Sequence, residues 1–137
     1  MANFAGKYHY HHNENFEKYM ETIAGAAGAD AAKKFHEYKP YFVVTVSGDY
    51  YTFTLYFGDK EITNSFYLGT EFDEKTFYFE TFKTVCKKYD NKLVFVSKFS
   101  NGNTSTREYE FTHGKVKAYY YEEKHGVTAT VWFEHHA

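Results

Sequence analysis

The chain has 137 residues, which fits one domain, and its net charge of −2 with no long run of like charge excludes the electrostatic footprint of a nucleic-acid-binding protein. No apolar run approaches the roughly 18 residues that a membrane-spanning helix needs. Aromatic residues make up 23% of the chain, more than a small solid core requires. Composition leaves two interpretations open, an internal space lined by rings or a tyrosine-rich β protein.

The first predicted elements are a strand and a helix that follows it directly. From Tyr8 to His12, alternate side chains share one face at period 2, which is the spacing of a strand. Asn13 or Asn15 can then cap a helix by accepting hydrogen bonds from amides of its first turn. Apolar residues at helical spacing form one inward-facing stripe on this helix: Phe16, Tyr19, Met20 and Ile23.

A second short helix is predicted after a break at residues 25–28, which contains two glycines. Asp30 can cap this helix, which runs from Ala31 to about His36. Pro40, the only proline, ends the helical region, because the residue before a proline is pushed out of the helical conformation.

After Pro40 the chain alternates between short strands and turns. The predicted strands are residues 42–46, 50–57, 62–68, 70–74, 77–87, 93–99, 106–111, 116–123 and 127–133. With the first strand they make ten, and closure into a barrel removes the two edges that an open sheet would expose. We therefore predict an all-β fold of one domain over residues 1–137, a ten-stranded up-and-down antiparallel β-barrel that is wide enough for a ligand. The helix-turn-helix serves as its lid.

Several stretches resemble the fatty-acid-binding proteins, the intracellular lipid-binding family of the calycin superfamily. The opening strand leads through Glu14-Asn15-Phe16 into a helix carrying Tyr19-Met20, as in that family. Residues 65–74, Lys39-Pro40 and residues 126–130 resemble further family segments. The resemblance implies a lidded β-barrel that binds a hydrophobic small molecule without covalent chemistry and carries it inside the cell.

One part of the family pattern is missing. Many members end their last strand with Arg-x-Tyr, which helps to hold a fatty-acid carboxylate, whereas this chain has Val131-Trp132-Phe133 at the matching positions. The expected ligand opening is also more aromatic here, at residues 77–79. These rings either contact a partner or membrane, or pack on the lid.

Arg107, the only arginine, shares a strand face with Tyr109 and Phe111, while the opposite face is wholly polar. We therefore expect Arg107 to point inward, where a buried charge needs a partner. A ligand carboxylate or Glu80, which alternates with Tyr78 and Phe82, can supply it. The alternative is an arginine at the rim that pairs with a surface glutamate. The resemblance also implies an interior arginine near this segment.

The proposed ligand is a long-chain fatty acid or a related lipid. The candidate ligand-binding residues are Phe16, Tyr19, Met20, Phe53, Leu55, Phe57, Ile62, Asn64, Phe66, Tyr78, Glu80, Phe82, Phe95, Arg107, Tyr109, Tyr120, Val131 and Phe133. Two alternatives stay open. The ligand is a ring-rich or neutral molecule such as a retinoid, sterol or pigment, or the barrel is filled by its own rings and has a structural or storage role.

No enzyme motif is present, neither a nucleophile motif nor a phosphate-binding glycine loop, so we expect no catalytic residues and no cofactor. His9 and His11 share one strand face and His12 follows, but without a matching ligand set we expect no functional metal site. The single cysteine, Cys86, and the absence of a signal-peptide pattern favour a cytoplasmic protein, which we expect to be a monomer.

The second predicted helix carries Lys33 and Lys34 beside Phe35. A basic tip with an apolar residue is suited to transient contact with an anionic membrane. The alternative, which we favour, is a solvated face. Asn103-Thr104-Ser105 matches a glycosylation sequon, which we interpret as a chance match.

Overall fold

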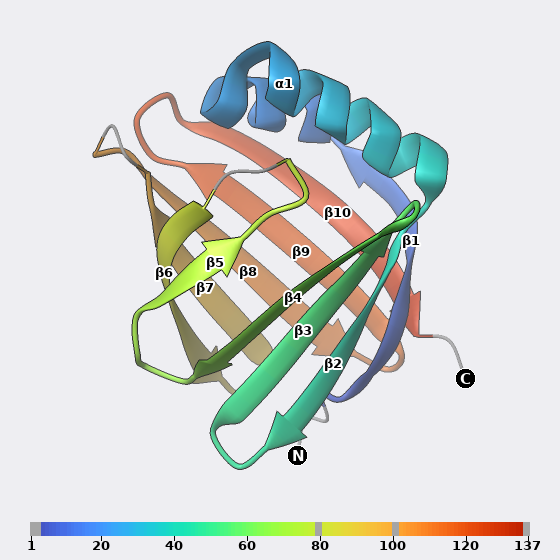
Figure 1. Cartoon of the computed structure of the whole chain (residues 1–137), viewed down its shortest axis with the longest axis vertical. Helices are drawn as coiled ribbons and strands as arrows, with labels where there is room; N and C mark the ends of the chain where they lie inside the picture. The colour runs from blue at the N-terminus through green and yellow to red at the C-terminus, as the bar shows by residue number, and fades with distance from the viewer. Residues whose placement is uncertain (1–3, 79–80, 100–101, 136–137) are drawn as a thin grey trace.

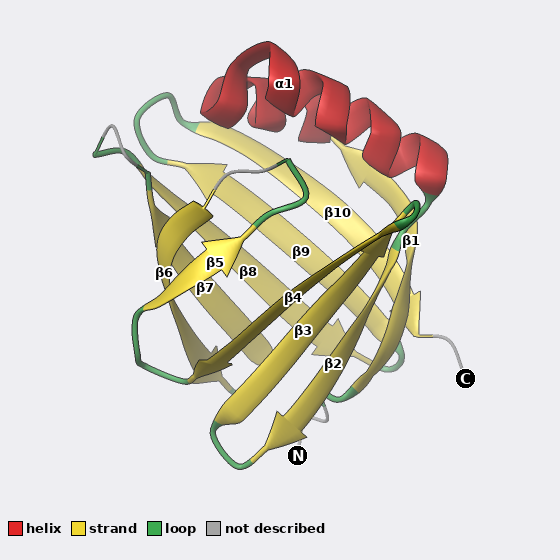
Figure 2. Ribbon diagram, in the orientation of Figure 1, coloured by secondary structure: helices red, strands yellow, loops and turns green. Residues whose placement is uncertain are grey.

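The computed structural model describes residues 4–78, 81–99 and 102–135, and its strands wrap into a barrel with a helix across one end (Figures 1 and 2). The elements are β1 Gly6–Glu14, α1 Phe16–Tyr38, β2 Tyr41–Ser47, β3 Tyr50–Phe57, β4 Lys60–Tyr67, β5 Phe72–Lys75, β6 Thr81–Tyr89, β7 Lys92–Lys98, β8 Thr104–Thr112, β9 Lys115–Glu122 and β10 Val127–His135.

The ten strands form one antiparallel sheet in the order β4-β3-β2-β1-β10-β9-β8-β7-β6-β5. Consecutive strands pair with each other except β4 and β5, although α1 separates β1 from β2 in the chain. The pairing of β1 with β10 joins the two ends of the chain. The predicted ten-stranded barrel is confirmed. Its edges are β4 and β5, where the Asn64 amide bridges to the backbone of Lys75: Nδ2 donates to the carbonyl oxygen at 2.9 Å, and the Lys75 N–H donates to Oδ1 at 2.8 Å.

The lid differs in detail from the predicted pair of helices. A single kink at Gly25, with φ 65° and ψ −148°, separates two helical segments that otherwise run on from Phe16 to Tyr38. Because glycine adopts this positive φ without steric cost, one residue makes the turn and no longer break is needed. Asn15 is the N-cap residue, but its side chain does not cap the helix, because Nδ2 donates to the Thr128 carbonyl at 2.7 Å. The side-chain acceptor for the first turn is Asn13, whose Oδ1 accepts from the Phe16 N–H at 3.4 Å.

Two predicted strand patterns were wrong. A register shift between Tyr10 and His12 lets β1 keep Tyr8 and Tyr10 buried but turns His12 outward, where its ring stacks on Trp132 with centroids 4.3 Å apart. A bulge of this kind inserts one residue into a strand, so the simple alternation is lost beyond it. The predicted strand 77–87 is also displaced, because β6 covers Thr81–Tyr89 and Phe77 lies in the preceding connection.

The lid packs on the barrel through a buried aromatic side chain. Phe35 exposes only 3% of its surface and contacts the rings of Phe57 and Phe77 at centroid distances of 6.0 and 5.1 Å. Phe16 packs against it from the start of the helix, at 5.3 Å. The rim ring Phe77 therefore packs under the lid, while Phe79 lies outside the described residues. Within the described part of the chain, no helix is both long enough and apolar enough to cross a bilayer.

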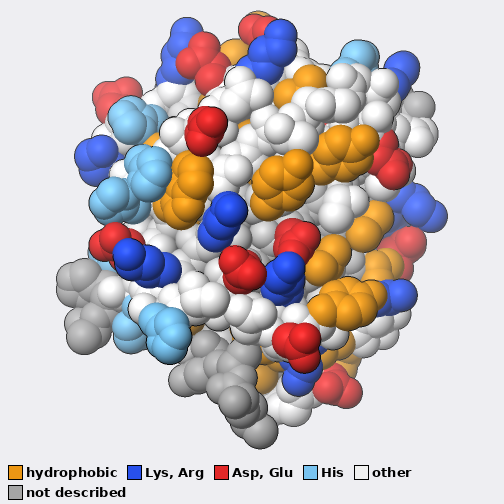
Figure 3. Space-filling view, turned by 180° about the vertical axis from the view of Figure 1, so that it is seen from behind, with side chains coloured by type: hydrophobic (Ala, Val, Ile, Leu, Met, Phe, Trp, Pro, Cys, Tyr) orange, Lys and Arg blue, Asp and Glu red, His pale blue; other side chains and the backbone are white. Residues whose placement is uncertain are grey.

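The outer surface of the barrel is chemically mixed. On the face seen from behind, acidic and basic side chains are interspersed with rings and histidines (Figure 3). Three exposed ion pairs illustrate this mixed surface, two on the barrel and one on the lid: Lys83 with Asp73, Lys92 with Glu108, and Lys33 with Glu17.

Candidate functional site

A cavity lies inside the barrel beneath α1. Its volume is only about 120 Å³. Ligand pockets typically have volumes of about 300–1,000 Å³. The interior is therefore a narrow space between rings, and a bulky ligand requires some of these rings to move.

Most of the candidate residues line this cavity. They come from α1 and from the inner faces of β3, β4, β6, β8, β9 and β10, with Tyr78 from the connection before β6. The predicted residues that the structure brings together here are Phe16, Tyr19, Met20, Phe53, Leu55, Ile62, Asn64, Tyr78, Phe82, Arg107, Tyr109, Tyr120 and Phe133. Their placement follows from strand alternation and the helical stripe, and their role in binding stays a prediction.

Four of the predicted residues that the structure describes do not line the cavity: Phe57, Phe66, Phe95 and Val131. Phe57 packs against the lid instead, while Phe66 stacks on Phe72 with centroids 4.6 Å apart and also contacts Phe95. Val131 is fully buried in the core. These side chains are in the core but outside the lining of the cavity, and the three phenylalanines are in contact with neighbouring rings. Glu80 lies outside the described residues.

The site also contains residues that sequence reasoning did not select. They are Ile23, Phe35, Phe42, Glu74, Lys75, Thr76, Phe77, Ser97, Phe99 and Ser105. Of these, Glu74 had a usable signal. It lies two residues after Phe72, so strand alternation places a carboxylate on the same face as an aromatic ring.

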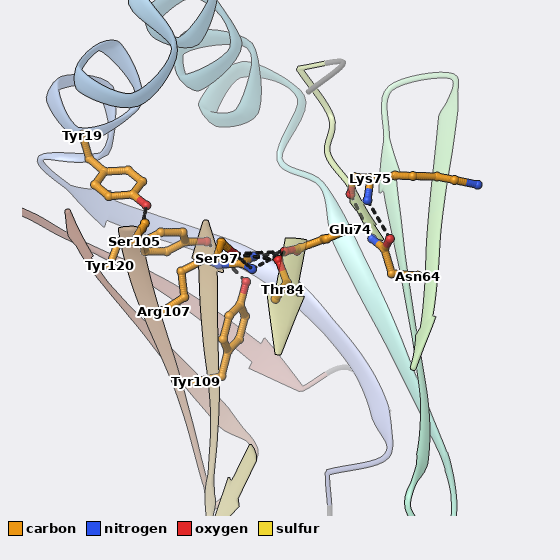
Figure 4. Close-up of polar contacts among 10 residues, drawn as sticks. All are labelled: Tyr19, Asn64, Glu74, Lys75, Thr84, Ser97, Ser105, Arg107, Tyr109 and Tyr120. Atoms are coloured by element: carbon orange, nitrogen blue, oxygen red, sulfur yellow. Dashed lines mark hydrogen bonds and ion pairs between the residues drawn. The ribbon is translucent and has the colours of Figure 1, made fainter. Parts of the chain in front are cut away.

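Arg107 points into the barrel and pairs with Glu74, a partner that the sequence analysis did not name (Figure 4). Nη1 donates to Glu74 Oε2 at 2.8 Å, Nη2 donates to Oε1, and Nη2 also donates to Ser97 Oγ at 3.2 Å. Thr84 Oγ1 donates to Glu74 Oε1 at 2.9 Å. Strands β5 to β8 thus each contribute one side chain to this polar wall.

The two charges of this wall are retained inside the protein. The side chains of Arg107 and Glu74 expose 16% and 10% of their surface. Burial works to lower the pKa of Arg107, but the charge and hydrogen bonds of Glu74 together with the nearby Tyr109 and Tyr120 outweigh burial. The pKa of the guanidinium therefore lies well above its ordinary value. Arg107 is therefore a cation whose charge is already balanced.

Uncharged phenols complete the polar part of the cavity. Tyr109 and Tyr120 hold their hydroxyls 3.4 Å apart, and the Tyr19 hydroxyl bonds with Ser105 Oγ. Burial raises the pKa of Tyr19 to about 12, although the bond to Ser105 works to lower it, and burial raises the pKa values of Tyr109 and Tyr120 as well. At neutral pH these residues are therefore neutral hydrogen-bonding groups.

The histidines of β1 do not form a larger cluster. His11 and His12 hold their Nδ1 atoms 2.5 Å apart, and the ring of His9 stacks on Tyr41. Among the residues that the structure describes, no three His, Cys, Asp or Glu side chains are grouped so that they could hold a metal ion.

Comparison with known proteins gives the class. The model of the lipocalin / cytosolic fatty-acid binding protein family matches residues 1–117. The chain belongs to this family. The matched region ends within β9, before the last strand and its Val131 and Phe133.

Individual relatives agree with this assignment. The chain is 35% identical over 95 residues to fatty acid-binding protein homolog 6 of Caenorhabditis elegans, covering 69% of each chain. It is 33% identical to the liver fatty acid-binding protein of Sus scrofa, covering 67% of this chain and 72% of that protein. Among solved structures, the REP1-NXSQ fatty acid transporter superimposes with a TM-score of 0.85 at 26% identity, covering 97% of this chain and 96% of that one.

Proposed function

We propose that this protein binds a long-chain fatty acid or a related lipid non-covalently in its barrel cavity and carries it through the cytoplasm as a monomer. The observation that carries this proposal is the ring-lined cavity inside a barrel whose end is covered by α1. The relatives named above as fatty acid-binding proteins support it.

Burial of the lipid chain provides the driving force. Each methylene moved from water to an apolar environment contributes roughly 0.8 kcal/mol, so a long chain binds with few polar contacts. Binding forms and breaks no covalent bond, and α1 controls the entry and release of the lipid. Phe77, which lies between Phe35 and Phe57, must move for a chain to pass under the lid.

Delipidated protein titrated with fluorescent fatty acids of increasing length tests the proposal. We expect saturable binding whose affinity rises with chain length. Lipid extraction from protein isolated from its natural source, followed by mass spectrometry, identifies the ligand and distinguishes an acyl lipid from a ring-rich molecule such as a retinoid.

A second candidate is a barrel filled by its own rings, with a structural or storage role. The small cavity volume of about 120 Å³ favours this second function. If no lipid binds to the delipidated protein and extraction yields none, this second function replaces the first.

A further inference from the structure

The interior of this barrel already holds a balanced pair of charges. Both carboxylate oxygens of Glu74 accept from Arg107, and Oε1 also accepts from Thr84 at 2.9 Å and Ser97 at 3.4 Å. The guanidinium and the carboxylate meet in the two-pronged geometry that suits them best. The pair therefore has no net charge to offer a ligand.

No other described cation faces this polar wall from the cavity lining. Lys75 belongs to the lining, but its side chain points away from Arg107 and toward the outside of the barrel (Figure 4). On the last strand, Val131 and Phe133 are buried apolar residues. A ligand carboxylate beside Arg107 would thus lie next to the Glu74 carboxylate, with one cation to share between two anions. A buried charge without its own partner is strongly unfavourable.

The same wall is well equipped for an uncharged polar group. The hydroxyls of Tyr109 and Tyr120 carry two protons, and the hydrogen bond between them uses one. One phenol proton is left to donate to a ligand oxygen, and the phenol oxygens can accept from a ligand hydroxyl or amide. The Tyr19 and Ser105 hydroxyls form a second such pair.

We propose that the ligand of this cavity is a long-chain lipid with an uncharged polar head, such as an alcohol, an ester or a primary amide, and that the Arg107–Glu74 pair selects against free carboxylates. This inference rests on the proposed function and narrows its ligand class. The apolar chain would lie among the rings of the cavity and the head beside the tyrosine hydroxyls.

Displacement of Nile red, an uncharged dye, from the delipidated protein at neutral pH tests this selection. The competitors are oleate, oleyl alcohol, oleamide and monooleoylglycerol, which share one chain and differ in the head. We expect the neutral ligands to compete at least about tenfold better than oleate. Oleate binding as tightly as the neutral ligands overturns this inference and leaves the proposed function standing. Binding of none of them overturns both.

A charge-neutralising variant tests the physical cause. Glu74→Gln keeps the shape and one acceptor oxygen but leaves Arg107 as an unpaired cation, so oleate affinity should rise at least about tenfold. Asp73→Asn is the matched control, because Asp73 is exposed and pairs with Lys83 outside the barrel. The double variant Glu74→Gln/Arg107→Gln restores a neutral interior and should again favour the neutral ligands. An oleate affinity that does not rise in Glu74→Gln overturns the inference.

Discussion

At the scale of single residues, the pairing of Arg107 with Glu74 dominates the interior. Both side chains are largely removed from solvent, and each has a further hydrogen bond, from Arg107 to Ser97 and from Thr84 to Glu74. Removing one member of a buried pair leaves the other as an uncompensated charge. This pair therefore matters for stability as well as for the choice of ligand.

Arg107→Ala should lower the free energy of unfolding by about 3–5 kcal/mol at neutral pH, because Glu74 then lacks its cation. Urea denaturation measures this loss. The control is Lys83→Ala, which breaks the exposed pair with Asp73 and should change stability by at most about 1 kcal/mol. Equally small losses in both variants would contradict a buried ionic pair.

Glu122, at the end of β9, makes stability depend on acid pH. Burial works to raise its pKa, but hydrogen bonds from Asn103 and from the backbone and ring of His125 outweigh burial, so the pKa is lowered from 4.5. A carboxyl with a lowered folded-state pKa stabilises the protein above its unfolded-state pKa, and this stabilisation is lost as pH falls through the folded-state value. The hydrogen bond to Glu122 engages the side-chain amide of Asn103, the asparagine of the sequon at residues 103–105.

In thermal unfolding below about pH 4.5, the wild type should therefore lose stability with falling pH more steeply than Glu122→Gln. Glu123→Gln, at the exposed neighbouring position, serves as the control and should follow the wild type. Parallel curves for the wild type and Glu122→Gln would show that Glu122 has the same pKa in the folded and unfolded states.

At the scale of elements, α1 is attached to the barrel through a few buried rings. Phe16 exposes 1% of its surface and contacts Phe35 within the lid and Tyr120 on β9 at centroid distances of 5.3 and 5.4 Å. The charged side chains of α1 face away from the barrel, and among them Lys34 pairs with Asp30 at 3.1 Å. The lid is thus held by apolar packing on one face and has locally balanced charge on the other.

Phe16→Ala should lower the free energy of unfolding by about 3–5 kcal/mol, because it leaves a cavity where the lid meets the barrel. Chemical denaturation gives the value. Glu21→Ala, on the exposed side of the same helix, should have little effect. A loss below about 1 kcal/mol for Phe16→Ala would mean that the helix packs in another orientation.

The lid lysines should contribute little to membrane contact. Lys33 and Lys34 are each close to an acidic partner, and Phe35, expected at the tip of the lid, is buried. We expect lipid transfer to vesicles with and without anionic lipid at similar rates. The double variant Lys33→Ala/Lys34→Ala should transfer lipid at the same rate as the control double variant Lys87→Ala/Lys88→Ala, which changes two lysines at the far end of β6. Since a lysine near an anionic surface contributes about 1 kcal/mol, a strong preference for anionic vesicles that is lost only in the lid variant would establish a membrane role.

At the scale of the whole molecule, the barrel is closed by backbone pairing everywhere except between β4 and β5. There the Asn64 side chain bonds to both the N–H and the carbonyl of Lys75, in place of a strand partner. Beside it lie cavity-lining residues such as Ile62 and Thr76. This side-chain bridge holds together the two edges of the sheet next to the cavity.

Asn64→Ala should speed amide hydrogen exchange in β4 and β5, because local opening then breaks two fewer hydrogen bonds. Exchange in β9 and β10, which are paired on both sides, should be unchanged. Thr63→Ala, the neighbouring exposed position on β4, is the control. Unchanged exchange in β4 and β5 would show that the bridge does not limit opening of this edge.

Much of the architecture was predictable because it depends on local patterns. The alternation of rings in β3 and the stripe of Phe16, Tyr19 and Met20 on α1 follow from periodicities that each element carries by itself. The bulge in β1 was not predictable, since one inserted residue leaves no mark on composition. The stacking of Phe72 on Phe66, which is not among the cavity-lining residues, was not predictable either, because it depends on how strands distant in the pairing order pack.

The sequence by itself predicted the barrel and the lid, and it favoured an inward Arg107 without excluding a position at the rim. The family resemblance showed that the usual arginine and tyrosine are missing from the last strand. Only the tertiary structure decided what Arg107 meets. Glu74 is 33 residues away in the chain and reaches the arginine across β6 and β7. Alternation sets the face on which a side chain lies, but sheet curvature and side-chain length set which groups touch across the interior. The charge available to a ligand depends on that contact.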